Sequence, residues 1–527
     1  MRLVVSLTVL ALIFSVASPA RTWYISNSGS NSNDGLSKEK PFLNFDNVNA
    51  ESLNATLQPK DSILLKGGET FHGTIVIYYG VDMYIGSYGD GLAIIKGPRA
   101  VHMENTSNCT VENIIGIGEN ITPYYDGFEF AMYDGNDDFG KRNVKINNVT
   151  ATGFGSRGIE IQTSWQMDKV TITNCTAANN GWDGISISGR PTQHLYDMKN
   201  VFISNCKAYN NAGTPLRYNW PTGNGISIMF ADSVNIENCE TNSNGGNSLF
   251  TMGANSGIYL SESKNVRLSN CKSHDNKGNN LTGLNGNGIF IGGASQNVTL
   301  ENCETYLNEG AGFKISNDYW INDYLGDTVI QGTMASMANF TFKYNKSTND
   351  ATLRDASITF DYNPMLSNTT NVFFDHTIIY QEHRFVFSNF TSKIEGLKFD
   401  STTICLTNTA QEYMQQPPSY VSILNTLYPC LSLSLQNVSS APRPNPIDLN
   451  KVSIGPNPMA NVLCVMVSHL AHKSQLRIFG INGQSIIKQN LYTGINSIDV
   501  SSLVQGVYLA EIRNDYRLIF YRILSKL

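Results

Sequence analysis

Hydrophobic and polar residues alternate in short stretches through most of the chain, and the stretches recur at a regular interval. In each stretch two aliphatic residues stand two positions apart shortly before an asparagine, as Val170 and Ile172 do before Asn174. This alternation is typical of a strand with one buried face. The recurring asparagines are Asn113, Asn148, Asn174, Asn205, Asn238, Asn270 and Asn302. Their spacing, roughly 30 residues, indicates stacked repeat units.

A second short strand is predicted after each turn, where a glycine precedes two hydrophobic residues separated by a variable one. Gly-Ile-Glu-Ile at 158–161 and Gly-Ile-Ser-Ile at 184–187 are examples. Short strands joined by Gly- and Asn-rich turns, without helical periodicity, favour a parallel β-helix over a leucine-rich repeat or a propeller. The predicted fold class is therefore all-β.

Equivalent residues of successive rungs in such a coil stack about 4.8 Å apart. We therefore expect the recurring asparagines to form a ladder of hydrogen-bonded side-chain amides. The cysteines that follow them are Cys175, Cys206, Cys239, Cys271 and Cys303. Ile114 and Val149 occupy the same column in earlier rungs, so we expect these thiols to be buried as small hydrophobic groups.

The ends of the chain predict export and a second domain. Residues 1–20 combine Arg2, an apolar run and small residues, which is typical of a secretory signal peptide; an N-terminal membrane anchor is the alternative. No other stretch is long enough to span a bilayer. The Pro- and Ser-rich residues 437–449 indicate a linker between a β-helix at 21–436 and a small domain at 450–527. Asn482-Gly483 between apolar strands predicts a hairpin within a small β-sandwich.

The beginning of the mature chain carries a resemblance that agrees with this fold. The segments WYISNSGSNSNDGLSKEKPFLNF, LQPKDSILLKGGETFHGTIVI and YIGSYGDG, together with the rungs, resemble secreted right-handed parallel β-helix proteins of the pectate-lyase-like superfamily. The resemblance covers about residues 22–410. It implies the fold but not the reaction, because the superfamily includes polysaccharide lyases, glycoside hydrolases, epimerases and non-catalytic adhesins.

The last 75 or so residues carry a second resemblance. Ile454-Gly455-Pro456-Asn457-Pro458, then LRIFGINGQSI and IDVSSLVQGVYLAEI, are similar to the C-terminal sorting domain of type IX secretion cargo in the Bacteroidetes lineage. The alternative is a carbohydrate-binding or structural β-module. The resemblance implies that the type IX secretion machinery is a partner and that the protein is secreted or attached to the cell surface.

The charge composition excludes one class of partner. Lys and Arg number 37 against 43 Asp and Glu, the net charge is −6, and no basic stripe occurs. Nucleic acid is therefore not expected as a partner.

One column of residues on the second strands is predicted to face outward, between the two inward hydrophobic positions. The column consists of Glu129, Glu160, Ser186, Ser227, Tyr259, Phe290 and Lys314. Glu129 and Glu160 are expected about 5 Å apart at Cβ, near Asp126, Arg157 and Asp183. Three interpretations are open: a raised pKa for acid catalysis, a calcium ion held by Asp126, Glu129 and Glu160, or a salt bridge to Arg157 on a solvated face.

Two insertions add further candidate residues. The segment 189–200 contains Arg190 and His194, which suit the cation and the base of a β-elimination. The segment 213–224 contains aromatic residues that suit stacking on sugars. The predicted catalytic residues are Glu129, Glu160, Asp183, Arg190 and His194. The predicted substrate-binding residues are Arg157, Arg217, Tyr218, Trp220, Tyr259 and Lys314.

These features favour a secreted polysaccharide-active enzyme, a lyase or a glycoside hydrolase, that binds a glycan along the outer face of the coil. The alternative is a non-catalytic cell-surface β-helix that binds glycans or acts as an adhesin. A polygalacturonase is disfavoured, because GNGIFIGG at 286–293 lacks the histidine that this family places in its Gly-His-Gly turn.

Overall fold

The structure is a computed structural model, and it divides the chain into two compact units, Met1–Leu431 and Ser432–Leu527. The described residues are 19–119, 124–133, 142–189, 196–216, 221–248, 255–278, 286–316, 337–352, 356–361, 369–381, 385–388, 394–406, 422–424, 452–455, 462–467, 474–480, 485–492, 494–514 and 517–526. The predicted linker 437–449 and nearly all of the predicted signal peptide lie outside them. Among the described residues, none of the helices has the length and hydropathy to cross a membrane.

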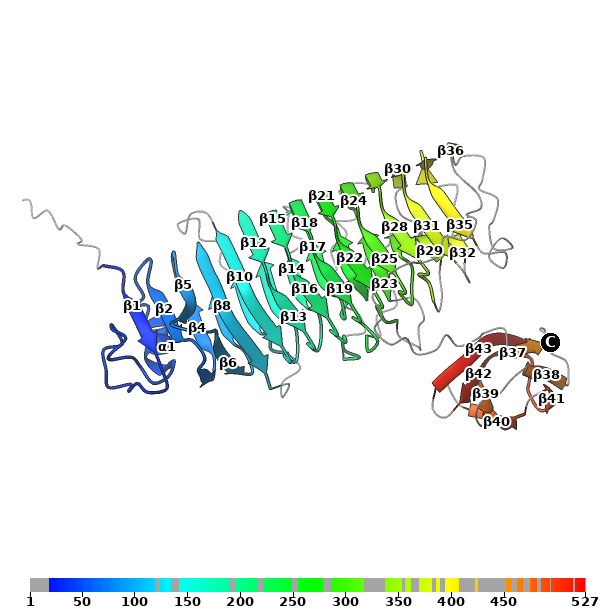
Figure 1. The fold of residues 1–527 in the computed structure, drawn as a ribbon, viewed down its shortest axis with the longest axis horizontal. Helices are drawn as coiled ribbons and strands as arrows, with labels where there is room; N and C mark the ends of the chain where they lie inside the picture. Colours follow the sequence, from blue (N-terminus) through cyan, green and yellow to red (C-terminus); the bar gives the residue numbers. More distant parts are fainter. Residues whose placement is uncertain are drawn as a thin grey trace, which may run out of the picture. The chain divides into compact units, whose positions relative to one another are not determined.

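The first unit is a coil of parallel strands that stack rung upon rung (Figure 1). Each rung contributes to a 25-stranded sheet, which is bent into two arms, and to a separate 11-stranded sheet. The separate sheet, called sheet B below, runs β4 (Ile75–Tyr78), β7 (Val101–Glu104), β9 (Phe128–Met132), β11 (Ile159–Thr163), β14 (Ile185–Ser188), β17 (Ile226–Met229), β20 (Ser256–Ser261), β23 (Asn287–Gly292), β26 (Phe313–Ser316), β29 (Ala356–Asp361) and β32 (Phe385–Ser388).

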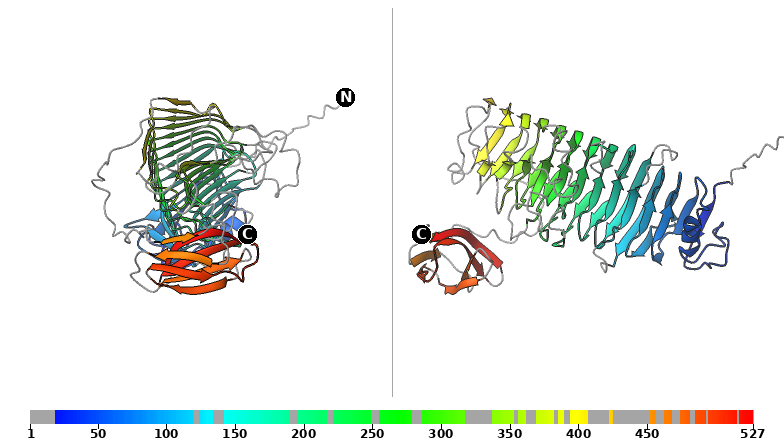
Figure 2. Two further views of the ribbon diagram at one scale, coloured as in Figure 1. Left: turned by 90° about the vertical axis from the view of Figure 1, so that its right-hand side faces the viewer. Right: turned by 180° about the vertical axis from the view of Figure 1, so that it is seen from behind.

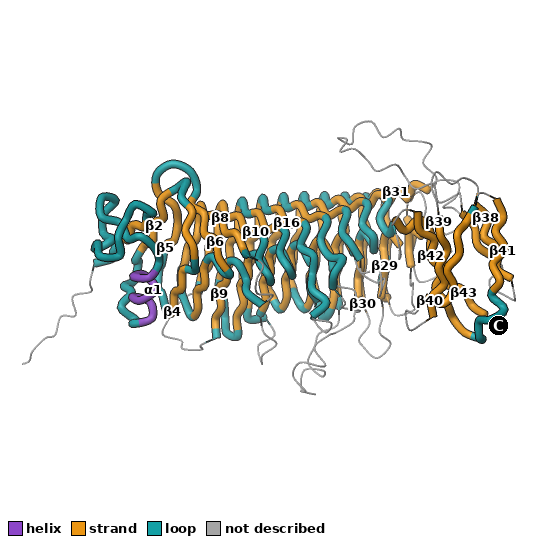
Figure 3. Tube along the Cα trace, turned by 90° about the horizontal axis from the view of Figure 1, so that it is seen from below, coloured by secondary structure: helices purple, strands orange, loops and turns teal. Residues whose placement is uncertain are grey.

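The bent sheet is called sheet A. Its first arm contains β1 (Thr22–Ile25), β2 (Ser62–Lys66), β5 (Tyr84–Tyr88), β8 (Cys109–Gly118), β10 (Asn143–Thr152), β12 (Lys169–Thr173), β15 (Met198–Ser204), β18 (Ala231–Glu237), β21 (Lys264–Ser269), β24 (Gln296–Glu301), β27 (Ala338–Lys343), β30 (Thr369–Asp375), β33 (Ile394–Glu395), β34 (Lys398–Asp400) and β36 (Ser422–Leu424). Its second arm contains β3 (Thr70–His72), β6 (Ala93–Gly97), β13 (Thr176–Ala178), β16 (Lys207–Tyr209), β19 (Glu240–Asn242), β22 (Lys272–His274), β25 (Glu304–Tyr306), β28 (Lys346–Thr348), β31 (Ile378–Gln381) and β35 (Thr403–Leu406). The long strands β8 and β10 run through both arms. Figure 2 shows the stacked rungs from two further sides, and Figure 3 shows the strand and turn segments repeating along the coil.

The alternating hydrophobic pairs predicted from the sequence form the core of the coil. Val170 lies opposite Val144 on one neighbouring strand and opposite Val201 on the other. Ile172 is paired in the same way with Ile146 and Ile203, and all six side chains are buried. The predicted all-β parallel coil is therefore confirmed, with equivalent residues in register. The cysteine column is buried as well, and its members are free thiols.

The asparagines that mark the repeat have a different role from the one predicted. All seven have a positive φ, as Asn174 (56°) and Asn205 (53°) do, and they form the bend between the two arms of sheet A. Asparagine tolerates this left-handed conformation better than most residues, which explains the choice. One pair does bond as predicted, since Asn148 donates to Asn113 over 2.8 Å, but Asn174 donates to Asn147 instead of Asn148. Among the described residues this pattern does not continue as one ladder, so the predicted ladder is wrong in its location.

A continuous amide ladder does exist, six residues later in each repeat. It consists of Asn180, Asn211, Asn244, Asn276 and Asn308, and it ends on Asp350. Each Nδ2 donates to the Oδ1 of the next member over 2.7–3.1 Å, and each Oδ1 also accepts the backbone N–H of the residue above. All members are buried. The ladder satisfies the backbone at the corner that leads into sheet B.

The helix α1 (Asp46–Leu53) covers the first strand of sheet B. Asn49 Oδ1 accepts the N–H of Val76 over 2.9 Å, and Ser52 Oγ accepts that of Tyr78 over 2.8 Å. Both N–H groups belong to β4, which would otherwise present an unpaired edge. Capping of this kind prevents further strands from adding to the end of the coil.

The second unit is a small β-sandwich, as predicted. One sheet contains β37 (Val452–Gly455), β38 (Val462–Val467) and β41 (Gly494–Asp499), and the other contains β39 (Ser474–Gly480), β40 (Ser485–Leu491), β42 (Gly506–Asn514) and β43 (Arg517–Lys526). All their pairings are antiparallel. Asn482-Gly483 lies outside the described residues, but the strands that it joins, β39 and β40, do pair as a hairpin.

Candidate active site

The predicted outward column runs down sheet B in register. Glu129 on β9 lies opposite Glu160 on β11, and Glu160 lies opposite Ser186 on β14. The column begins earlier than predicted, because His102 on β7 lies opposite Glu129. The sequence signal for His102 is Val101-His102-Met103, which has the same hydrophobic, variable, hydrophobic order as the later strands. Glu129 is only 6% exposed and Glu160 only 1%, so the predicted solvated face is wrong.

Arg157 lies at the centre of a buried charged cluster. Its Nε is 3.3 Å from Oε2 of Glu160 and 3.9 Å from Oδ2 of Asp183, while its Nη1 is 3.9 Å from Oδ1 of Asp126. The guanidinium carbon also lies 4.8 Å from the centre of the Trp182 ring. The predicted salt bridge between Arg157 and the carboxylates is therefore present, in a site that excludes most of the solvent.

Glu129 has basic partners of its own. Its Oε2 lies 2.9 Å from Nδ1 of His102 and 3.2 Å from Nη1 of Arg99. The Nε2 of His102 lies 3.6 Å from Glu104. Neither Arg99 nor His102 was predicted as a site residue. The two glutamates of the column thus share one face of the sheet but have different neighbours.

These different neighbours drive the two pKa values apart. Burial raises the pKa of Glu160 to about 8, because Arg157 offsets the loss of solvation only in part and Asp126 and Asp183 add negative charge. Burial acts in the same direction on Glu129, but the hydrogen bond from His102 and the charge of Arg99 outweigh it, so the pKa of Glu129 is lowered. The two environments therefore favour the protonated form of Glu160 and the ionised form of Glu129.

The two aspartates of the cluster have structural roles. Asp126 accepts the backbone N–H of Arg157 over 2.8 Å, and Asp183 accepts that of Asn224 over 2.7 Å. Asn224 in turn accepts the N–H of Ser256 over 2.9 Å. These residues therefore fix the turn that enters each strand of sheet B. Burial raises the pKa of Asp183 to about 6, although Arg157 and the hydrogen bonds from Asn224 oppose it.

The other predicted site residues are distant or lie outside the described residues. Tyr259 is stacked on Phe290, with 5.0 Å between ring centres, and is three strands from Glu160. Lys314 is buried five strands from Glu160, a distance of about 24 Å at the usual strand spacing. Neither contacts the carboxylate pair. The predicted residues that lie outside the described part of the chain are Arg190, His194, Arg217, Tyr218 and Trp220.

The predicted calcium ligands do not fit a metal ion in this arrangement. Within the described part of the chain, no three or more His, Cys, Asp or Glu residues converge closely enough to hold a metal. Arg157 already provides the positive charge between Asp126 and Glu160. The proposed chemistry uses no metal ion.

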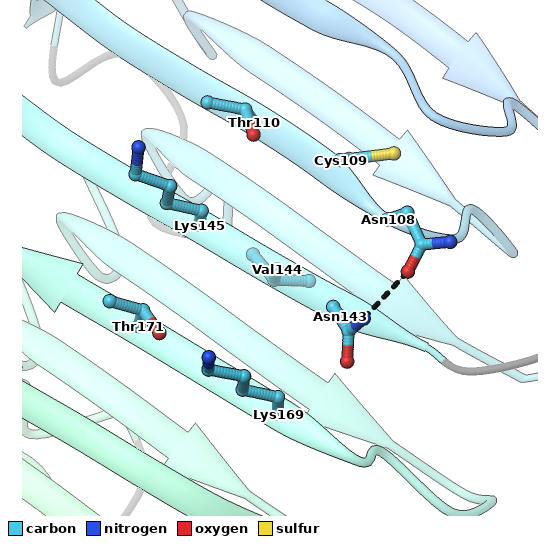
Figure 4. Close-up of a pocket in the computed structure, with 8 residues that line it drawn as sticks. All are labelled: Asn108, Cys109, Thr110, Asn143, Val144, Lys145, Lys169 and Thr171. Atoms are coloured by element: carbon cyan, nitrogen blue, oxygen red, sulfur yellow. Dashed lines mark hydrogen bonds between the residues drawn. The ribbon is translucent and has the colours of Figure 1, made fainter. Parts of the chain in front are cut away.

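An open depression of about 410 Å³ lies on sheet A, not on sheet B. Figure 4 shows Lys145 on β10 and Lys169 on β12 at this depression, with Asn143 donating a hydrogen bond to Asn108 over 2.7 Å. The remaining lining residues are Cys109, Thr110, Val144 and Thr171. No carboxylate lines it, so the depression is separate from the cluster of sheet B.

Comparisons with known families agree with both units. Residues 133–323 match the family model described as right handed beta helix region. Residues 453–526 match the one described as secretion system C-terminal sorting domain. No curated protein matches the chain. The sorting domain shows that the protein is secreted or attached to the cell surface, and it implies export by the type IX secretion machinery.

Solved structures extend the likeness over most of the chain. The A-module of the Azotobacter vinelandii mannuronan C-5 epimerase AlgE6 is 14% identical, with a TM-score of 0.53; the match covers 74% of this chain and 94% of that one. The GH136 lacto-N-biosidase from Eubacterium ramulus is 13% identical, with a TM-score of 0.43 and coverage of 77% and 68%. Pectate lyase Pel9A is 16% identical, with a TM-score of 0.37 and coverage of 72% and 79%. At such identities the likeness to the epimerase module shows the right-handed parallel β-helix fold alone.

Proposed function

We propose that this secreted right-handed parallel β-helix protein is a glycoside hydrolase that acts on a neutral glycan. The observation that carries the proposal is the pair Glu129 and Glu160, which lie directly opposite each other and have pKa values shifted in opposite directions. Such divergence separates a general acid from an ionised carboxylate. Adjacent strands lie about 4.8 Å apart, which suits the carboxyl separation of about 5–5.5 Å in retaining glycosidases.

The proposed reaction has two steps. Glu160 donates its proton to the glycosidic oxygen while an oxygen of Glu129 bonds to the anomeric carbon and the carbon–oxygen bond to the leaving sugar breaks. Water then attacks that carbon, Glu160 takes the proton from water, and Glu129 leaves. His102 and Arg99 favour the ionised form of Glu129 that attacks in the first step and leaves in the second.

The charge of the cluster favours a neutral substrate over a uronate. Besides Glu160, four carboxyl groups (Glu104, Asp126, Glu129 and Asp183) accompany two arginines and one histidine, although burial raises the pKa of Asp126. Among the described residues, the cations of the cluster are already paired with these carboxylates, so a uronate carboxylate entering this site would meet repulsion.

The burial of the pair favours a second function. Glu160 is 1% exposed, so a glycan reaches it only after a rearrangement over sheet B. A cluster that stays closed would make the protein a non-catalytic surface β-helix that binds glycans elsewhere, with Arg157 and its carboxylates as structural elements.

A screen of the full-length protein on neutral and uronate polysaccharides tests the proposal. We expect new reducing ends from a neutral glycan, without absorbance from unsaturated products and without a requirement for calcium. Unsaturated products from a uronate would show a lyase instead. Glycan binding without any product would support the non-catalytic function and contradict the proposal.

A further inference from the structure

We infer that Tyr133 and Trp165 form a sugar-stacking subsite at the end of the strands that carry Glu129 and Glu160. The inference rests on the proposed function, because it assigns a binding site for the same neutral glycan. Tyr133 directly follows β9, and Trp165 lies two residues after β11. Since β9 and β11 pair in parallel, both aromatic residues lie at the same end of adjacent strands.

Both rings are exposed, unlike nearly all other residues of this face. Trp165 is 47% exposed and Tyr133 42%. Large aromatic side chains of this kind usually bury their surface, and an exposed pair beside polar groups is the arrangement that stacks on the faces of pyranose rings. A neutral hexose unit is therefore the ligand that we assign to it.

Hydrogen bonds hold the two residues together. Trp165 Nε1 donates to the backbone oxygen of Tyr133 over 2.8 Å, and the N–H of Ser164 donates to that of Met132 over 2.7 Å. The backbone N–H of Trp165 also donates to Thr163 Oγ1 over 3.0 Å. These bonds fix the position of the indole before any ligand arrives, which lowers the entropic cost of binding.

Gln162 connects this subsite to the carboxylate pair. Its Nε2 donates to the hydroxyl of Tyr133 over 2.7 Å and lies 3.4 Å from Oε1 of Glu129. Gln162 lies opposite Ala131, whose small side chain leaves room for the amide to cross the strand. Glu129, Ala131 and Tyr133 occupy alternate positions, so they lie along one face.

The spacing makes this a subsite for a neighbouring sugar and not for the reacting one. Tyr133 is four residues from Glu129, which corresponds to about 13 Å along a strand. Trp165 lies at this distance, because its Nε1 bonds the backbone oxygen of Tyr133, whereas the Tyr133 hydroxyl reaches back towards Glu129 through Gln162. The length exceeds one pyranose ring, so the sugar stacked on Trp165 is separated from the cleaved bond by at least one unit. The glycan would then lie across the coil, along the strand direction.

Binding to the inactive Glu160→Gln variant tests the subsite. The probes are cello-, manno-, xylo- and galacto-oligosaccharides of two and six units, and binding is measured by calorimetry. We expect Trp165→Ala in this background to weaken binding of the preferred hexasaccharide at least tenfold and to leave the disaccharide nearly unchanged. Trp165→Phe should retain most of the affinity, and Tyr492→Ala, an exposed tyrosine of the other unit, should retain all of it.

Two outcomes would overturn the subsite: unchanged hexasaccharide affinity in the double variant Tyr133→Ala, Trp165→Ala, or no binding of any of these probes. Failure of the proposed function has a different signature. If Glu160→Gln keeps full turnover while Trp165→Ala still weakens hexasaccharide binding, the hydrolase mechanism is wrong and the subsite stands.

Discussion

Arg157 is the residue on which the charge balance of the cluster depends. It is buried beside three carboxylates, so its removal leaves negative charge in a site that excludes solvent. We expect Arg157→Met to lower the free energy of unfolding by about 3–5 kcal/mol at pH 7, as measured by urea denaturation. The matched control is Arg267→Met, which breaks the exposed 2.8 Å pair with Glu301 and should cost less than about 1 kcal/mol. Equal losses in the two variants would contradict the central role of Arg157.

The raised pKa of Glu160 predicts a pH dependence of stability. The folded state binds this proton more tightly than the unfolded state, so the stabilisation is complete below the ordinary pKa of 4.5 and is lost as the pH rises through about 8. Asp183 contributes in the same direction, but its part is lost by about pH 6. We therefore expect the free energy of unfolding of the wild type to fall between pH 6 and 8. Burial also raises the pKa of Glu262 to about 7, so in Glu160→Gln a fall up to about pH 7 should remain while the part that extends to about pH 8 should be absent. Parallel curves for the two proteins would show that Glu160 titrates normally.

At the scale of the element, the buried amide ladder is a main stabiliser of the corner before sheet B. Asn244 accepts two N–H groups from Asn211 and donates to Asn276 and to the backbone of Ala208. Asn244→Ala leaves these partners buried and unpaired, and we expect a loss of about 1–3 kcal/mol in urea denaturation. The control is Asn297→Gly in an exposed row of asparagines, which keeps the positive φ of 53° and should change stability by less than about 0.5 kcal/mol. If Asn297→Gly lowered the free energy of unfolding as much as Asn244→Ala, the ladder would not be a main stabiliser of this corner.

The strands could be predicted from the sequence, but the function of individual asparagines could not. The alternation of Val170 and Ile172 fixes which face is buried, and the repeat interval fixes the partner strands, so these features follow from local patterns. Asn174 and Asn180 are the same residue type, six positions apart, and only the three-dimensional bend decides which has a positive φ and which hydrogen-bonds its neighbours.

The candidate site, too, could be predicted from the sequence only in part. Pairing of Glu129 with Glu160 follows from the register and was predicted. The burial of both, and the approach of Arg99 and His102 to Glu129 alone, depend on how residues pack over sheet B, which no repeat pattern encodes. Trp165 was missed because it lies just beyond the strand, in a turn without repeat character.

At the scale of the whole molecule, the two units have separable roles. The residues proposed to bind and cleave the glycan all lie in the β-helix unit, and the sorting domain directs export. We expect a chain that ends after Leu431 to keep the circular dichroism spectrum and unfolding midpoint of the β-helix but to be lost from the medium and the cell surface. Immunoblots of cell fractions, with the full-length chain as control, measure this. A truncated chain found outside the cell in normal amounts would contradict the assignment of export to residues 453–526.

The central claim is that Glu160 and Glu129 divide the roles of acid and nucleophile. The most direct test is kcat/KM on the neutral oligosaccharide selected by the screen, for the wild type, Glu160→Gln and Glu129→Gln, each checked for an unchanged fold. We predict that each variant loses at least about 100-fold, because each removes one half of the proton and bond exchange. Turnover within about threefold of the wild type in either variant would contradict the account.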